Sequence, residues 1–272
     1  MLHADGSSGA WGNLGLWRDD PDDYAGACTA LAQAVAAAAG LRAGDRVLAV
    51  ACGAGEELRL WQALGAAEVV AVEQSAAQVH AARARAPGAR VFEGSGAALT
   101  QLGLPAGHFD RVLCVDAAYH LIPRPAFLQG AWSLLRPGGT LAFTDLVAER
   151  PRPLLRAAAR LCGLQPADVL VSEDLQRQRL QAAGFADVRF ERLDDAVLGG
   201  FARFVRQRRV APWRWPRVAV TAALIGPCRA AGLGYAMLAA RRPLETGASA
   251  TQAAAASAER TALSSSGTPG IA

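Results

Sequence analysis

The stretch of sequence that decides the fold is Val47-Leu48-Ala49-Val50-Ala51-Cys52-Gly53-Ala54-Gly55. Its apolar half, Val47–Ala51, is typical of a strand that is buried on both faces of a parallel sheet. The glycines follow directly, and the next residues have the pattern of a helix up to about Leu64. Glycine is needed where a ligand approaches the backbone closely or where φ is positive, and free N–H groups at a helix start face such a ligand. The stretch therefore predicts a strand, a ligand-binding turn and a helix.

Strands and helices alternate on both sides of this unit. The Ala-rich segment before it, Tyr24–Ala39, predicts a helix that ends at Gly40. Further strands are predicted at 69–72, 90–92, 111–115 and 139–146, and further helices at 75–86 and 125–135. Strands that alternate with helices of this length predict βαβ units. We therefore expect a Rossmann-like, doubly wound α/β fold with a mostly parallel sheet.

The pattern changes after Glu149, where two prolines interrupt the chain. Helices are predicted at 154–162, 172–183 and 196–209, and strands at 187–193 and 234–240, the last of them antiparallel at or near an edge. We expect an N-terminal cap segment at 1–23 and one domain at 24–245, with helical lid insertions at about 150–183 and 196–232. Residues 246–272 consist mainly of Ala, Ser, Thr and Gly, with few large apolar side chains, which predicts a disordered tail.

Bulk composition argues against several classes of protein. Hydrophobic residues make up 52% and charged residues 19% of the chain, which is the balance of a folded protein with a sizeable core. The net charge of +4 is small and the arginines are scattered, which argues against a nucleic-acid partner. Five cysteines without a C-x-x-C pair predict neither a disulfide framework nor a zinc site, and no ligand cluster indicates another metal. Because the N-terminus lacks an apolar signal segment, we expect a cytoplasmic protein.

Acidic residues around the glycine turn indicate the kind of cofactor. Glu73 stands at the end of the next predicted strand, where a carboxylate accepts hydrogen bonds from both ribose hydroxyls of a nucleoside; an ordinary helix-cap acid is the alternative. The dinucleotide pattern G-x-G-x-x-G is incomplete, because Leu58 stands where its third glycine belongs. Glu56 and Glu57 would repel a pyrophosphate but suit the sulfonium and ammonium groups of S-adenosylmethionine (SAM). The residues therefore favour SAM over a nicotinamide dinucleotide.

The chain resembles the class I SAM-dependent methyltransferases, and within them the tocopherol, sterol and sugar-O methyltransferases. The resemblance runs from about Asn13 to Pro243 and depends on several short motifs together. These are Asn13-Leu14-Gly15-Leu16-Trp17, Val50-Ala51-Cys52-Gly53-Ala54-Gly55, Glu73, Gly94-Ser95-Gly96, Phe109-Asp110, Tyr119-His120 and Leu135-Arg136-Pro137-Gly138-Gly139, the last being the turn before the strand at 139–146.

The resemblance implies a set of cofactor-binding residues at the carboxyl ends of the strands. The methionine moiety, the ribose, the adenine and the donor methyl group would each have their own contacts, and the N-terminal segment would close over the cofactor. Ala51, Gly53 and Gly55 would line the methionine moiety, Glu73 would hold the ribose, and Gln74, Ser95 and Gly96 would contact the adenine. Val115 and Asp116 would flank the donor methyl group, and Trp17 belongs to the closing segment.

Three positions depart from the family pattern. The family commonly has an acid in place of Ala49, a glycine in place of Ala51 and an aspartate in place of Ser95. Each departure predicts weaker SAM binding, since a hydroxyl accepts a hydrogen bond more weakly than a carboxylate and the methyl group of Ala51 stands where the backbone meets the ligand. A non-catalytic SAM-fold binding protein therefore stays open as the alternative.

His120 is the candidate catalytic residue. Methyl transfer from a sulfonium depends mainly on alignment and desolvation, and a base is needed only where the acceptor must lose a proton. Imidazole titrates near neutrality, and His120 follows Tyr119 shortly after the fourth strand, with Tyr119 and Asp116 as orienting partners. The alternative is a structural histidine bonded to a backbone carbonyl.

The acceptor is expected to be small and mainly apolar, methylated on O, N or C. Its predicted contacts are Tyr119, Phe201, Phe204 and Trp213, although aromatic residues at helical spacing are also typical of a plain core. The arginine- and tryptophan-rich segment 206–217 supports an alternative, a membrane-peripheral enzyme with a lipid-like acceptor. A membrane-spanning helix at 218–240 is disfavoured by Pro227 and Arg229. The tetrapeptide N/D-P-P-Y/F of base methylases is absent after the fourth strand, so nucleic acid is not an expected partner.

Overall fold

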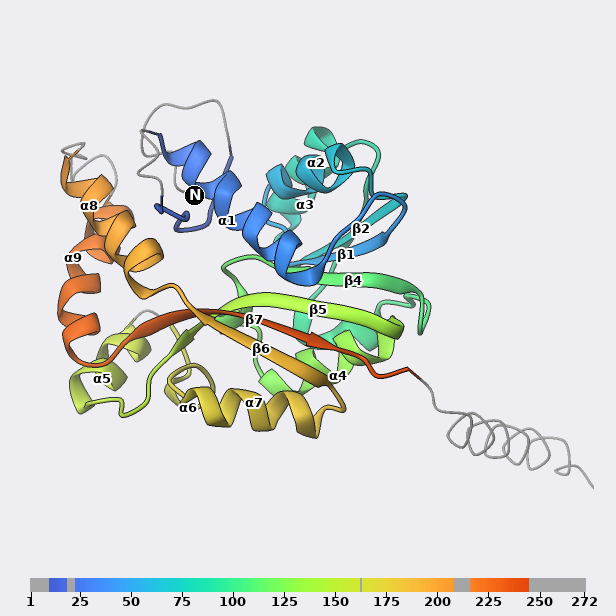
Figure 1. Ribbon diagram of the computed structural model, residues 1–272. Helices are drawn as coiled ribbons and strands as arrows, with labels where there is room; N and C mark the ends of the chain where they lie inside the picture. Colours follow the sequence, from blue (N-terminus) through green and yellow to red (C-terminus); the bar gives the residue numbers. More distant parts are fainter. Residues whose placement is uncertain (1–9, 19–22, 162, 208–215, 245–272) are drawn as a thin grey trace, which may run out of the picture.

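The computed structural model describes residues 10–18, 23–161, 163–207 and 216–244, and these form a seven-stranded sheet (Figure 1). β1 to β5 are parallel, whereas β7 lies between β5 and β6 and runs antiparallel to both. This arrangement confirms the predicted Rossmann-like fold with an antiparallel last strand. The strands, in the spatial order β3-β2-β1-β4-β5-β7-β6, are β3 (Arg90–Glu93), β2 (Glu68–Glu73), β1 (Arg46–Val50), β4 (Phe109–Cys114), β5 (Leu135–Val147), β7 (Gly234–Arg241) and β6 (Ala186–Arg192).

The strand order reverses between β1 and β4. Four of the five residues of β1 and all of β4 are buried, because both faces of the sheet are covered there. Ligands of open α/β sheets bind outside the carboxyl ends of the strands, at such a reversal. The topology therefore directs attention to the residues that follow Val50 and Cys114.

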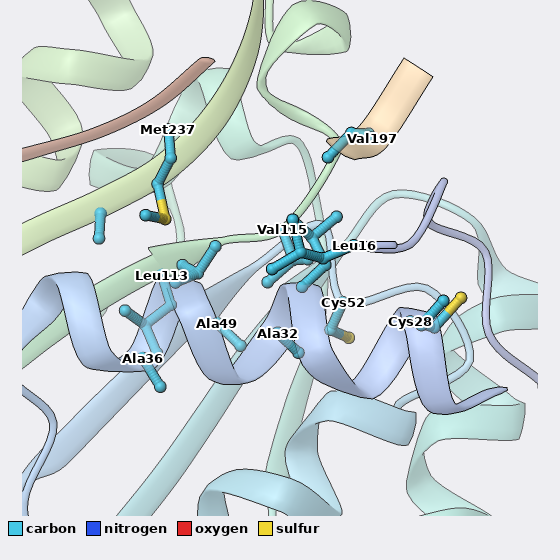
Figure 2. Packing of buried hydrophobic residues seen from close by; sticks show 14 of the residues in the cluster. Leu16, Cys28, Ala32, Ala36, Ala49, Cys52, Leu113, Val115, Val197 and Met237 are labelled. Carbon is cyan, nitrogen blue, oxygen red and sulfur yellow. The ribbon is translucent and has the colours of Figure 1, made fainter. Parts of the chain in front are cut away.

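Helices cover both faces of the sheet. One face carries α1 (Tyr24–Ala39), α2 (Glu56–Ala63) and α3 (Ala76–Arg85), and the other carries α4 (Arg124–Leu134) and a 3-10 turn at Gly96–Gln101. The helix predicted at 24–39 begins after Asp23, which caps it, and ends at a left-handed Gly40. Figure 2 shows how the small side chains of α1, among them Ala32 and Ala36, let this helix lie close to the strands.

Three of the helices that follow β5 gather at the carboxyl-terminal end of the parallel strands. In Figure 1, α8 (Gly200–Gln207) and α9 (Pro216–Ala230) lie beside the first described residues, and α5 (Pro153–Leu161) lies next to α9. A π-helical turn (Asp195–Gly199) precedes α8, so the helix predicted from residue 196 is divided in two. A short helix, α6 (Pro166–Val169), was not predicted.

α7 (Glu173–Ala182) was predicted as part of the lid, and the structure corrects this. It packs against α4 and β6, and it buries Gln176 and Leu180. Leu180 belongs to the cluster that covers the second face of the sheet. The prediction failed because a helix that covers a sheet and a helix that covers a ligand have the same 3.6-residue pattern.

The run Leu135–Gly139 was predicted as a turn but is the irregular beginning of β5. The pairing with β4 shifts between Phe109↔Leu135 and Arg111↔Thr140, which leaves the intervening residues as a bulge. The N–H of Gly138, at φ 80°, donates to the carbonyl of Arg242 at 2.9 Å. The motif thus ties β5 to the end of β7, which is a structural role.

Several predictions concern residues outside the described ranges. These are the tail at 246–272, Trp213 and most of the segment 206–217. Within the described ranges, no helix is both long and apolar enough to cross a bilayer.

Candidate active site

Four loops meet at the carboxyl ends of the central strands. Ala51–Gly55 follows β1, Glu73 and Gln74 close β2, Ser95 and Gly96 follow β3, and Val115 and Asp116 follow β4. Because β1 to β4 are parallel and adjacent, these loops share one edge of the sheet. The structure therefore brings together every predicted cofactor-binding residue except Trp17.

The glycine loop depends on three residues in the left-handed conformation, Ala51, Gly53 and Gly55, with φ of 59°, 54° and 86°. A Cβ on Gly53 would have no atom within 4 Å, so the loop has free space at this position. A Cβ on Gly55 would stand 2.9 Å from the Cα of Ala82 in α3. Gly53 thus fits the close approach of a ligand, whereas Gly55 is required because the loop packs tightly on α3.

Ala51 adopts its left-handed conformation without the freedom of glycine. Alanine in this region costs roughly 1–2 kcal/mol, so we expect Ala51→Gly to raise the free energy of unfolding by about 0.5–1 kcal/mol, net of the entropy that glycine loses on folding. Urea unfolding measures the difference. The matched control is Ala49→Gly, in the middle of β1, which should destabilise the protein; a loss of stability at both positions would contradict the argument.

The Glu73 carboxylate holds the glycine loop in place. Its side chain is buried; Oε2 accepts from the N–H of Gly53 at 3.0 Å and Oε1 from the N–H of Ser75 at 2.9 Å. Carboxylate oxygens have further lone-pair sites. The same group can therefore accept hydrogen bonds from ribose hydroxyls while it supports the loop.

Ser95 and Gly96 form the next loop. The hydroxyl of Ser95 accepts from the N–H of Ala97 at 3.2 Å and so caps the 3-10 turn. A Cβ on Gly96 would stand 2.9 Å from a methyl group of Leu121, so glycine is needed here for packing. The exposed Gln74 and the partly exposed Ser95 are the polar side chains available on this side of the edge.

The two acids of the first turn of α2 have different surroundings. Glu56 pairs with Arg85 at 2.9 Å and accepts from the backbone N–H of Ala10 at 2.9 Å. Glu57 is 7% exposed, and its Oε1 has no hydrogen-bond partner among the described residues. Burial, assisted by the charge of Glu73, raises the pKa of Glu57 to about 8.

Asp116 is the centre of a buried hydrogen-bond network. Its carboxylate accepts from the N–H of Leu14 at 2.7 Å, from the hydroxyl of Tyr235 at 2.7 Å and from the hydroxyl of Tyr119 at 3.0 Å. Burial raises its pKa to about 6, although these hydrogen bonds oppose the rise. Asp116 thus joins the N-terminal segment, β7 and the turn after β4, a role that the sequence did not predict.

Trp17, Phe201 and Phe204 occupy core positions. The Trp17 ring stacks on Phe204 with centroids 4.7 Å apart, and its Nε1 donates to the carbonyl of Leu14 at 2.9 Å. Phe201 is fully buried in the same cluster. None of these three side chains lines the cavity described below, so the contacts of Trp17 with the cofactor and of Phe201 and Phe204 with the acceptor stay predictions. These rings join the N-terminal segment to α8.

A cavity of about 760 Å³ lies beside the loops, under the helices that follow β5. Tyr119 and His120 line it, with Thr221 as a further polar residue. The other lining residues are apolar: Leu14, Leu146, Leu155, Ala158, Ala159, Leu161, Leu164, Leu170, Leu198, Val220, Leu224, Ile225, Cys228 and Leu233. Of the side chains predicted to contact the acceptor, Tyr119 lines this cavity, whereas Phe201 and Phe204 do not. The sequence did not single out the aliphatic lining residues, because aliphatic residues give the same signal in a core and in a cavity wall.

His120 has the environment of a neutral imidazole. It belongs to a 3-10 turn (Ala118–His120), the residue as a whole is exposed, and its ring centroid lies 4.6 Å from that of Tyr119. Burial of part of the ring, together with the positive charge of Arg124, lowers its pKa. A neutral imidazole that faces a cavity is available to accept a proton.

A fully buried ion pair lies beneath this turn and was not predicted. Arg124 pairs with Asp145 at 2.9 Å and donates to the carbonyl of Ala118, and Gln176 donates to Asp145 at 2.8 Å. The signal in the sequence was the polar pair Thr144-Asp145 within an otherwise apolar strand. No group of three or more metal-ligating side chains comes together in the described part of the chain.

The residues at this edge fit SAM. Glu73 supplies acceptors for a ribose, free space lies over Gly53, and an unpartnered buried carboxylate oxygen stands on Glu57. A cofactor with a nucleoside at one end and positive charge at the other satisfies all of these features. When bound, SAM supplies an activated methyl group. Fold and site together define an enzyme of the class I methyltransferase type.

Comparisons with known proteins identify the family. Residues 48–143 match the family described as "Methyltransferase domain". Over 212 residues the chain is 32% identical to erythromycin 3''-O-methyltransferase of Saccharopolyspora erythraea, covering 72% of this chain and 68% of that protein. The chain belongs to the SAM-dependent methyltransferases and acts on small-molecule acceptors.

A second relative agrees with this family, and a solved structure agrees with the fold. Over 184 residues the chain is 34% identical to 27-O-demethylrifamycin SV methyltransferase of Amycolatopsis mediterranei, covering 64% of this chain and 67% of that protein. A putative sarcosine dimethylglycine methyltransferase from Galdieria sulphuraria superposes with a TM-score of 0.71 at 16% identity, covering 85% of this chain and 93% of that one. At this identity the superposition supports the fold alone.

Proposed function

We propose that the protein transfers the methyl group of SAM to a hydroxyl group of a small-molecule acceptor that is mainly apolar and polyketide-like. The observation that carries this proposal is the cavity of about 760 Å³, in which Tyr119 and His120 face a wall of aliphatic side chains. Its volume is within the range of sites for drug-sized ligands. The two relatives named for O-methylation of erythromycin and of a demethylrifamycin support the choice of oxygen and of the acceptor class.

Each part of the site then has one task. Glu73 and the glycine loop orient the cofactor, and the apolar cavity excludes water and aligns the acceptor, which is the main requirement of an in-line displacement. His120 accepts the proton that the hydroxyl group loses. The segments around α5, α8 and α9 act as the lid, and the N-terminal segment acts as a cap because Leu14 is fixed to Asp116.

The test is methyl transfer to hydroxylated macrolides compared with free sugars, measured by mass spectrometry together with the release of S-adenosylhomocysteine. Leu224→Trp fills part of the cavity, so the acceptor should lose several methylene contacts with the wall. We expect KM for the acceptor to rise by roughly 10–100-fold and SAM affinity to stay unchanged. The matched control is Leu64→Trp, at an exposed leucine outside the cavity. Equal KM in both variants would contradict the assignment of the cavity.

A second candidate is peripheral contact with a membrane that holds a lipid-like acceptor. The observation that favours it is the outer surface of α5. Leu154 and Leu161 are 64% and 88% exposed, and Leu161 also lines the cavity. Exposed arginines lie in the same segment, namely Arg152, Arg156 and Arg160. Such a helix fits an anionic bilayer surface. Co-sedimentation with anionic vesicles at low salt, lost in Leu154→Ser/Leu161→Ser, would support this candidate, and a protein that stays in the supernatant would exclude it.

A further inference from the structure

Glu57 is a buried acid that no group in the described structure neutralises. Its neighbour Glu56 has Arg85 and the N–H of Ala10 as partners, whereas Glu57 has an Oε1 atom that is both inaccessible to solvent and without a hydrogen bond. Arg85 also donates to the carbonyl of Ala54 at 2.6 Å. A carboxyl group in this situation is costly unless a partner is supplied.

The position of Glu57 shows where that partner would come from. It is the second residue of α2, directly after the glycine loop. Its charge acts on Cys52, Glu73 and Cys114, which lie at the carboxyl ends of β1, β2 and β4. Glu57 therefore lies at the edge of the sheet where the cofactor loops meet, within the electrostatic range of the carboxylate that holds the glycine loop.

SAM has two positively charged groups. Its sulfonium has no hydrogen to donate, whereas its α-ammonium has N–H donors that match an unpartnered carboxylate oxygen. We propose that Glu57 is the counter-ion of the α-ammonium group of SAM and thereby fixes the methionine end of the cofactor.

A structural alternative exists for an acid at this position. A negative charge in the first turn stabilises a helix through the helix dipole, and that role requires no ligand. The two roles differ in what they predict: a structural acid affects all ligands alike, whereas a counter-ion affects only ligands that carry the ammonium group.

Calorimetric titrations with three ligands test the proposal. SAM and S-adenosylhomocysteine carry the ammonium group, and 5′-methylthioadenosine lacks it. We expect Glu57→Gln to weaken the first two by roughly 10–100-fold and to leave the third within about twofold. Asp174→Asn, which removes an exposed acid from the first turn of α7, is the matched control and should bind all three nearly as the wild type does. Equal loss for the three ligands in Glu57→Gln, or no loss, would overturn the proposal.

Proton release gives a second reading. A carboxyl group that is largely protonated before binding must lose its proton to pair with an ammonium group, so SAM binding to the wild type at pH 7 should release protons. Titrations in buffers of different ionisation enthalpy measure this release. Three other titratable groups face Glu57. Burial raises the pKa values of the Cys52 and Cys114 thiols, so both are protonated at pH 7. Glu73 is excluded as the source of the protons if proton release disappears in Glu57→Gln. Proton release that persists in Glu57→Gln would contradict the proposal. Thermal unfolding of the ligand-free variant checks that the substitution causes no folding defect.

Discussion

Replacing Arg124 with methionine is expected to lower the free energy of unfolding by about 3–5 kcal/mol, because it leaves Asp145 buried without its counter-ion. Both side chains are fully buried, and the pair is 2.9 Å apart. Burial raises the pKa of Asp145, and the charge of Arg124 opposes that rise. In the variant, the buried Asp145 should therefore be protonated. Thermal unfolding is expected to shift downward by on the order of 10 °C.

The control for this prediction removes both charges. Arg124→Met/Asp145→Leu should recover much of the lost stability, since an apolar pair of similar volume is often as good as a buried ion pair. Gln176 loses its acceptor in the double variant, so recovery should be partial. A single Arg124→Met variant that loses less than about 1 kcal/mol would show that the pair carries little of the stability of this region.

His120→Ala is expected to reduce kcat by about 10²–10⁴-fold, the usual contribution of a positioned general base, with SAM affinity unchanged. Turnover near the wild-type level would refute the role of His120 as a base. His80→Ala is the matched control, because His80 is exposed on α3 and does not line the cavity.

The dependence of the rate on pH gives an independent check on His120. A base must be neutral, so the rate falls as the pH drops below the pKa of the imidazole. Since burial and Arg124 lower that pKa below its ordinary value of about 6.5, the wild type should keep most of its kcat/KM at pH 6.5 and lose it only under more acidic conditions. An acid limb centred above pH 6.5 would be inconsistent with the environment seen in the structure.

The sequence determined the architecture and the location of the candidate cofactor site. The apolar run ending at Ala51, the glycines after it and the acid at the end of the next strand are local patterns, and strand and helix periods are read over a few residues. Parallel strands then bring the loops after them to one edge whatever the details of packing. For this reason Gly53, Glu73, Ser95 and Val115 were placed together correctly.

Tertiary structure alone decided what each side chain does there. Asp116 is bonded to Leu14 and to Tyr235, residues 102 and 119 positions away, and no local pattern reports such pairings. Phe201 and Phe204 form core while leucines of α5 and α9 form the cavity wall, because one helical period describes both a packed face and an open one. Glu56 and Glu57 are adjacent and identical in type, yet only the folded chain gives one an arginine and leaves Oε1 of the other buried without a hydrogen-bond partner among the described residues.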